Sequence, residues 1–176
     1  MIRQNKLNIK MKKQKQSEYF ISPSKGRISF DNIIYDLVDY MEASPKDKYM
    51  LVVGSDSKLY RKEAVFVSVI FIHRVGKGAR YFYRRSKKKM SRNLRQRMYM
   101  ETELSLELGQ ILIKRIHSAL SNADLNYDFE IHVDIGKNGP TKEMIREIIG
   151  MIQGNGFVAR YKPESFCAST VADKHT

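Results

Sequence analysis

Four acidic residues have the spacing of a set that could act together: Asp56, Glu101, Asp134 and Asp173. Carboxylate oxygens are the ligands that hard divalent cations such as Mg²⁺ and Mn²⁺ take in proteins. When two such ions lie about 3.5–4 Å apart, one activates water and the other stabilises the leaving oxygen of an in-line displacement at phosphorus. The four acids therefore predict a two-ion Mg²⁺ or Mn²⁺ site for phosphodiester hydrolysis.

Asp56 belongs to the segment 49–58, YMLVVGSDSK, which has strand character. Its residues 50–53 are apolar on both alternating faces, which is typical of a strand that is covered on both sides in the middle of a sheet. We expect Asp56 at the carboxyl end of this strand, where open α/β sheets bind their ligands. The alternative is that Asp56 caps a turn through Ser55 and Ser57.

Asp134 closes a second expected strand, 126–134, and His132 shares its face because strand side chains alternate. Asp173 lies in the short last segment of the chain, which we expect to be helical, with His175 close by. The two histidines are secondary candidates, as a ligand of the metal or as a proton shuttle. A single histidine is more often structural or exposed.

Glu101 lies on a helix expected from about 93 to 117. Glu103 and Glu107 fall on its polar stripe and should face solvent. Glu101 falls instead on the apolar face, and an acid on the buried side of a helix needs a partner or a metal. Glu103 remains the alternative ligand if the helix is rotated from this position.

The net charge of +13 is concentrated in two segments. Residues 1–16 carry six Lys or Arg and residues 84–97 carry eight, with no acid in either, so the rest of the chain is close to neutral. Two basic patches on a near-neutral body indicate a polyanionic partner, with nucleic acid favoured over an anionic membrane surface. We interpret residues 1–16 as a flexible basic arm and 84–97 as a basic loop.

The other expected elements complete an α/β domain over residues 17–176. Ser29 is expected to cap a helix that ends before Pro45. The expected strands 49–58, 64–73 and 81–84 are joined by short connections, which indicates an antiparallel meander. The remaining strands are expected at 64–73, 81–84 and 157–162, and a further helix at 141–153.

Composition narrows the class of protein. The chain has 176 residues, of which 42% are hydrophobic, so it can bury a substantial core. It has no apolar run near the ~20 residues of a membrane span and no signal-peptide pattern, so we expect a cytoplasmic protein. A single cysteine, Cys167, excludes an intrachain disulfide and a zinc site made of cysteines.

Four motifs resemble the YkuK family of ribonuclease H-like proteins: VGSDSK, HVDIGKNGPTKEMIREIIGMIQGNGF, YKPESFCAS and VADKHT. The resemblance covers about residues 20–176. It implies a five-stranded mixed sheet whose first three strands are antiparallel and whose fourth and fifth run parallel to the first, with helices on both faces. It also implies that Asp56, Glu101, Asp134 and Asp173 are the four acids of the site.

The same resemblance places the basic loop beside the metal site, because the loop leads into the helix of Glu101. The chain has no tryptophan, so it lacks the tryptophan-bearing basic handle of some ribonucleases H. The loop is its expected substitute, and phosphate contacts are predicted for Arg84, Arg85, Lys87, Lys88, Lys89, Arg92, Arg95 and Arg97.

The expected function is therefore a metal-dependent nuclease that acts on RNA, an RNA–DNA hybrid or structured DNA. A non-catalytic nucleic-acid-binding module on the same fold is the first alternative. A factor that engages ribosomes or acidic protein partners in assembly is the second.

Overall fold

A computed structural model of the protein describes residues 19–61, 63–90, 92–120, 125–136, 142–165, 170–171 and 174–175. The expected basic arm, Cys167 and Asp173 lie outside these residues. Among the helices that the structure describes, none is long and apolar enough to cross a membrane.

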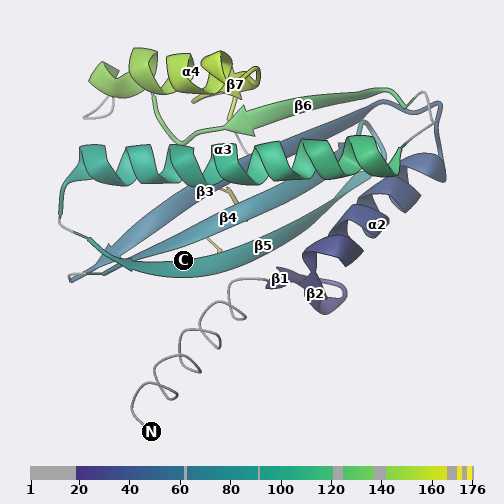
Figure 1. Ribbon diagram of the computed structural model, residues 1–176, viewed down its shortest axis with the longest axis horizontal. Coiled ribbons are helices and arrows are strands. Elements are labelled where there is room, and N and C mark those ends of the chain that lie inside the picture. The colour runs from purple at the N-terminus through teal and green to yellow at the C-terminus, as the bar shows by residue number, and fades with distance from the viewer. Residues whose placement is uncertain are drawn as a thin grey trace, which may run out of the picture.

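Five strands form the sheet that the sequence predicts (Figure 1). The strands β3 (Tyr49–Tyr60), β4 (Glu63–Arg74) and β5 (Gly78–Lys89) pair antiparallel over their full lengths. The strand β6 (Tyr127–His132) runs parallel to β3, and β7 (Val158–Arg160) runs parallel to β6. The predicted fold class is confirmed, with β3 as the middle strand of these five.

A hairpin that the sequence does not predict extends this sheet to seven strands. It consists of β1 (Tyr19–Ser22) and β2 (Gly26–Ser29), and β1 pairs with β5. The order is therefore β2-β1-β5-β4-β3-β6-β7. The turn between the two strands is where Pro and Gly indicate it, but strands of four residues are too short to show a pattern of their own.

Three helices lie on one side of the sheet: α2 (Phe30–Glu42), α3 (Leu94–Ala119) and α4 (Ile145–Gly154), the last preceded by the 3-10 turn Lys142–Met144. The predicted cap of α2 is confirmed, since the Ser29 hydroxyl accepts a hydrogen bond from the backbone N–H of Asn32 at 3.2 Å. Asn93 caps α3 in the same way, at 3.2 Å from the N–H of Gln96. Figure 1 shows α3 running across the sheet.

The main core lies between the sheet and these helices. Tyr49 is fully buried there, and its hydroxyl donates to the carbonyl oxygens of Tyr40 at 3.0 Å and Ser44 at 3.1 Å at the end of α2. Alternate residues of β3 contribute the apolar side chains, because side chains of a strand alternate between the faces. The buried cluster also includes Leu51, Val53, Ile70, Ile72, Ile33, Leu37, Met41, Leu108, Leu112 and Ile116.

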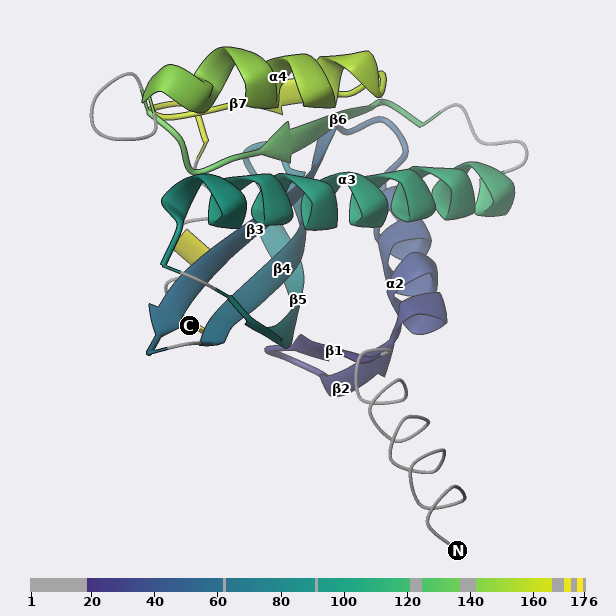
Figure 2. The ribbon, with the colours of Figure 1, turned by 60° about the vertical axis from the view of Figure 1, so that its left-hand side comes forward.

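The opposite face of the sheet is covered near the C-terminus. Val171 packs there against Val52, Val67 and Val69. Residues 170 and 171 are helical, and this short yellow segment lies beside β3 in Figure 2. Helical residues therefore cover both faces, as expected.

The prediction that residues 84–97 form a basic loop is wrong. The strand β5 continues to Lys89 because β4 pairs with it along its whole length, up to Glu63 opposite Lys89. Arg95 and Arg97 already belong to α3. A run of Lys and Arg gives little strand signal, but this one completes the pairing of a long hairpin, and the pairing decides its structure.

Candidate active site

The parallel pairing of β3 and β6 ends at Gly54 and His132, and the two aspartates follow at equivalent positions. Asp56 and Asp134 each come two residues after that last pair, so they flank the point where the two strands separate. Openings at the carboxyl ends of parallel strands are where α/β sheets bind ligands. The two acids predicted from strand ends are thus brought to one edge.

Asp56 itself is not terminal in its strand. It pairs with Val67 of β4, and β3 continues four residues further to Tyr60. The Asp56 carboxylate accepts a hydrogen bond from the backbone N–H of Ser57 at 2.7 Å. Because the backbone here is extended, the alternative of a turn cap through Ser55 and Ser57 is wrong.

Glu101 of α3 lies against β3 and is 4% exposed. The hydroxyl of Ser57 donates a hydrogen bond of 2.6 Å to its Oε1. Arg97, one helical turn earlier, places its Nε 4.0 Å from the same oxygen. The side chain that helical periodicity assigned to the apolar face is therefore buried, with Ser57 as its partner.

The pKa of Glu101 is raised from its ordinary 4.5 to about 8. Burial is the main cause, because a carboxylate loses its hydration there. The hydrogen bond from Ser57 and the charge of Arg97 lower the pKa, whereas the negative charges of Asp56 and Asp134 raise it. The charges of Asp56 and Asp134 thus reach Glu101, although the side chain of Asp56 leaves β3 on the face opposite to Ser57.

Two buried polar atoms beside Glu101 make no hydrogen bond within the described residues, Nε of Arg97 and Oδ1 of Asp134. The ammonium group of Lys162 lies 2.6 Å from that oxygen, as an ion pair whose direction is not that of a hydrogen bond. Buried polar atoms without hydrogen bonds are uncommon and often mark a place for water, an ion or a ligand. The site is thus polar and incompletely satisfied.

A divalent cation fits the donor chemistry of this site. Asp56, Glu101 and Asp134 supply oxygen ligands, and a cation would offset the effect of Asp56 and Asp134 that disfavours the ionised form of Glu101. Within the described part of the chain, no three acidic, His or Cys side chains already have the spacing to hold an ion. Binding therefore requires these carboxylates to move closer together, and the fourth predicted ligand, Asp173, lies outside the described residues.

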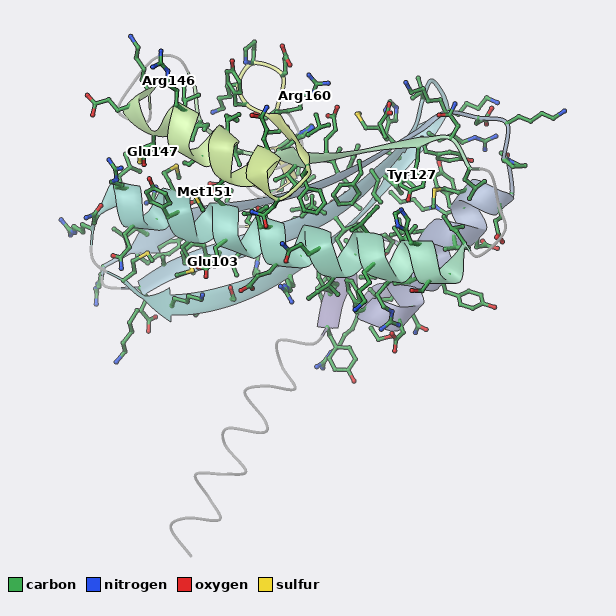
Figure 3. The ribbon with its side chains drawn as sticks, turned by 45° about the horizontal axis from the view of Figure 1, so that its top comes forward. Glu103, Tyr127, Arg146, Glu147, Met151 and Arg160 are labelled. Carbon is green, nitrogen blue, oxygen red and sulfur yellow. The ribbon has the colours of Figure 1, made fainter. Side chains whose placement is uncertain are left out.

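The structure separates the two glutamates that the sequence left open. Glu103 is exposed on α3, as Figure 3 shows, whereas Glu101 is buried. This arrangement supports Glu101 over Glu103 as a ligand.

His132 is fully buried, and its Nε2 lies 3.0 Å from Oε2 of Glu130. Burial lowers its pKa, against the opposing effect of Glu130, so the ring is neutral at pH 7. Arg160 of β7 donates to the other Glu130 oxygen at 3.0 Å. Burial alone would raise the pKa of Glu130, but the bonds from Arg160 and His132 bring it below its ordinary value.

His175 lies on the face of the sheet opposite α3. Its ring stacks on Tyr83 with centroids 3.8 Å apart, and its Nε2 is 3.4 Å from the hydroxyl of Tyr81. Burial lowers its pKa, and the nearby positive charges of Arg85 and Lys174 add to that effect. Its described contacts are thus with the aromatic side chains of β5.

The predicted phosphate-binding residues do not form one continuous surface. Arg85, Lys87, Lys88 and Lys89 are exposed along β5, whereas Arg84 is half-buried beneath α3. Arg95 pairs with Glu147 of α4 at 2.6 Å. Arg97 faces Glu101, and Arg92 is exposed just before α3.

Sequence reasoning missed Ser57 as the partner of Glu101. Strand alternation could have found it, because Ser57 must face the side opposite to Asp56, where the helix packs. The Glu130–Arg160 pair had no comparable signal, since it depends on the register of β6 with β7.

Residues 32–176 of the chain match the family described as Ribonuclease H-like. The chain is also 30% identical over 165 residues to the uncharacterized protein YkuK of Bacillus subtilis (strain 168). That alignment covers 89% of the chain and 96% of the relative. No solved structure matches the chain.

Proposed function

Because the chain belongs to the ribonuclease H-like family, we propose that it is a nuclease that uses Mg²⁺ or Mn²⁺ to hydrolyse phosphodiester bonds in RNA, an RNA–DNA hybrid or structured DNA. One observation carries the proposal: Asp56 and Asp134 follow the last residue pair of the separating strands β3 and β6, and Ser57, next to Asp56, binds the buried carboxyl of Glu101. Carboxyl groups at such a strand opening are oxygen donors suited to divalent cations.

In this proposal Asp56 and Asp134 hold the ions from the two separating strands, and Glu101 binds from α3. When bound, two ions would supply an activated water and stabilise the leaving oxygen. Glu101, with a pKa of about 8, must lose its proton to serve as a ligand. Ser57 fixes Oε1 of Glu101, and Lys162 must release Asp134.

The test is to incubate the pure protein with labelled RNA, RNA–DNA hybrid and branched DNA, with Mn²⁺ or with EDTA. Cleavage should require the metal, and Asp56→Asn should reduce it by more than about 100-fold, the upper end of the cost of losing an outer-shell partner. Glu103→Gln is the matched control, because Glu103 is an exposed acid two residues from Glu101. It should leave cleavage unchanged.

Cleavage that survives Asp56→Asn would come from another site or a contaminant and would contradict the proposal. Failure of all three substrates in Mn²⁺ would contradict it as well.

A second function, binding of nucleic acid without cleavage, is favoured by the ion pairs at the site. Lys162 and Arg97 bring positive charge to Asp134 and Glu101 without any metal. This version predicts salt-sensitive binding that Asp56→Asn does not weaken. Binding measured at several salt concentrations in EDTA separates it from the nuclease.

A further inference from the structure

The basic run on β5 is divided between the two faces of the sheet, because side chains alternate along a strand. Arg84 places its guanidinium 5.2 Å from the ring of Phe20, and Lys88 lies 2.9 Å from the sulfur of Met100, a residue of α3. Tyr83 packs on the opposite face, with Val67 and Val171. Arg85, Lys87 and Lys89 follow Tyr83 at intervals of two and therefore share its face.

That face is also the face of Asp56. The pairing register places Asp56 opposite Val67 and Val67 opposite Arg85. Lys58 and Lys87 flank Val65 in the same way. Since neighbouring strands are about 4.8 Å apart, Arg85 lies in line with Asp56 at about 10 Å.

The basic residues of this face are exposed, and one acid of the described part of the chain, Glu63, lies directly opposite the last of them, Lys89. Lys58, Arg85, Lys87 and Lys89 are all exposed, and no ion pair among the described residues includes them. Ten basic residues elsewhere are paired with carboxylates: Lys25, Lys48, Arg74, Lys77, Arg80, Arg95, Arg97, Arg115, Arg160 and Lys162. The charge of this row is therefore available to a partner.

The rings of His175 and Tyr83 form a stacked aromatic column at the Arg85 end of this row. The ring of His175 lies parallel to that of Tyr83, with an interplanar angle of 10°. Arg85 follows Tyr83 by two residues on the same face of β5, so it lies next to the column. A basic track that ends in stacked rings is typical of surfaces that bind single-stranded nucleic acid.

We propose that a single-stranded nucleic acid lies along β5 on this face, with its phosphates on Lys58, Arg85, Lys87 and Lys89 and a base against the His175–Tyr83 column. Side chains two residues apart on a strand are about 6.8 Å apart, which suits successive phosphates of an extended strand. The inference rests on the proposed function, since it is the alignment of Arg85 with Asp56 that would bring a phosphate toward Asp56. A duplex would need a second basic track.

The experiment compares two adjacent lysines that have the same charge and exposure but lie on opposite faces. Binding of a fluorescein-labelled oligouridylate of about 12 nucleotides, within the usual site size, is measured by anisotropy in EDTA at several salt concentrations. Lys87→Ala should weaken binding roughly fivefold at 0.1 M salt and lower the salt slope by about 0.7, the value for one phosphate contact with a single strand. Lys88→Ala should change neither.

The double variant Lys87→Ala, Lys89→Ala should lower the slope by about 1.4. Equal effects of Lys87→Ala and Lys88→Ala would overturn the proposal, and so would the absence of binding. Binding of a duplex of the same length that is as tight and as dependent on Lys87 would overturn the assignment to a single strand. Thermal midpoints equal to that of the unaltered protein show that both variants are folded.

EDTA keeps this test separate from the nuclease test. Binding that depends on Lys87, in a protein without Mn²⁺-dependent cleavage, supports the track and contradicts the nuclease. Cleavage that requires Asp56 but is unchanged by Lys87→Ala supports the nuclease and contradicts the track.

Discussion

Glu101 combines two properties that rarely occur together, a buried carboxyl group and other acids close to it. A buried acid without a cation is expected to remain protonated, because its charged form has lost hydration. The pKa of about 8 agrees with that expectation. Such a group costs little in the neutral state and becomes a ligand only when a cation makes its ionisation favourable.

The stability of the metal-free protein should therefore depend on the proton of Glu101. Between its ordinary pKa of 4.5 and its folded pKa of about 8, the folded state holds a proton that the unfolded state releases. Stability from this group is full below pH 4.5 and is lost as the pH rises through 8. The loss should be at most about 5 kcal/mol, from 1.36 kcal/mol per pKa unit.

Chemical denaturation in EDTA at about pH 5 and about pH 8.5 measures this effect. Because other groups also titrate, the quantity of interest is the difference between the unaltered protein and Glu101→Gln. The variant cannot ionise at this position, so its stability should fall less over the interval. Equal falls in the two proteins would show that Glu101 titrates normally.

At the scale of the element, the sequence predicts where strands and helices begin more reliably than how far they continue. The apolar residues of β3 and β4 identify those strands, and the capping residues Ser29 and Asn93 identify the starts of two helices. The length of β5 could not be predicted in this way, because its second half consists mostly of Lys and Arg. Only pairing with β4 keeps it extended.

Ion pairs of Asp36 connect the helix α2 to the sheet, although a charged residue is not part of the hydrophobic pattern that predicts the buried side of a helix. Asp36 is 6% exposed and lies 2.8 Å from Nζ of Lys25 and 2.5 Å from Nη1 of Arg80. It joins the helix to the β1–β2 turn and to β5. Like Glu101, Asp36 is an acid on the inner side of a helix, but two basic side chains contact it, at 2.8 Å and 2.5 Å.

Replacing Asp36 should destabilise the fold without affecting the acids of the site. Asp36→Ala leaves Arg80 without its carboxylate and should lower the free energy of unfolding by about 1–3 kcal/mol. The partners are partly exposed, which keeps the loss below that of a fully buried pair. Urea denaturation at pH 7 measures it.

Asp39→Ala is the control for this prediction, because Asp39 is an exposed acid on the same helix. It should change the stability by no more than about 0.5 kcal/mol. If both variants lose the same stability, the contacts of Asp36 are not what ties α2 to the sheet.

At the scale of the whole molecule, the sequence predicts that Asp56 and Asp134 lie where β3 and β6 end their pairing, but not what surrounds them. Periodicity selected Glu101 over Glu103, and strand ends selected Asp56 and Asp134. The sequence makes Lys162 a candidate partner of the proposed acids or of phosphate, but that its partner is Asp134 depends on how the chain returns beside β6 after β7. The same holds for Ser57, whose contact with Glu101 joins residues 44 positions apart.

Lys162 has a consequence for the affinity of the site, because its ammonium group competes with any cation for Asp134. Lys162→Met keeps the length of the side chain and removes the charge. It should tighten Mn²⁺ binding by about two- to fivefold, the value of an exposed ion pair, since Lys162 is 52% exposed. Isothermal titration calorimetry measures the affinity, and the thermal shift at fixed Mn²⁺ checks it.

Lys48→Met is the matched control, since Lys48 forms an exposed ion pair of 2.9 Å with Asp128, before the strand opening. Equal changes in the two variants would reflect net charge alone, whereas weaker binding in Lys162→Met would mean that Lys162 helps to hold Asp134 in place for the metal.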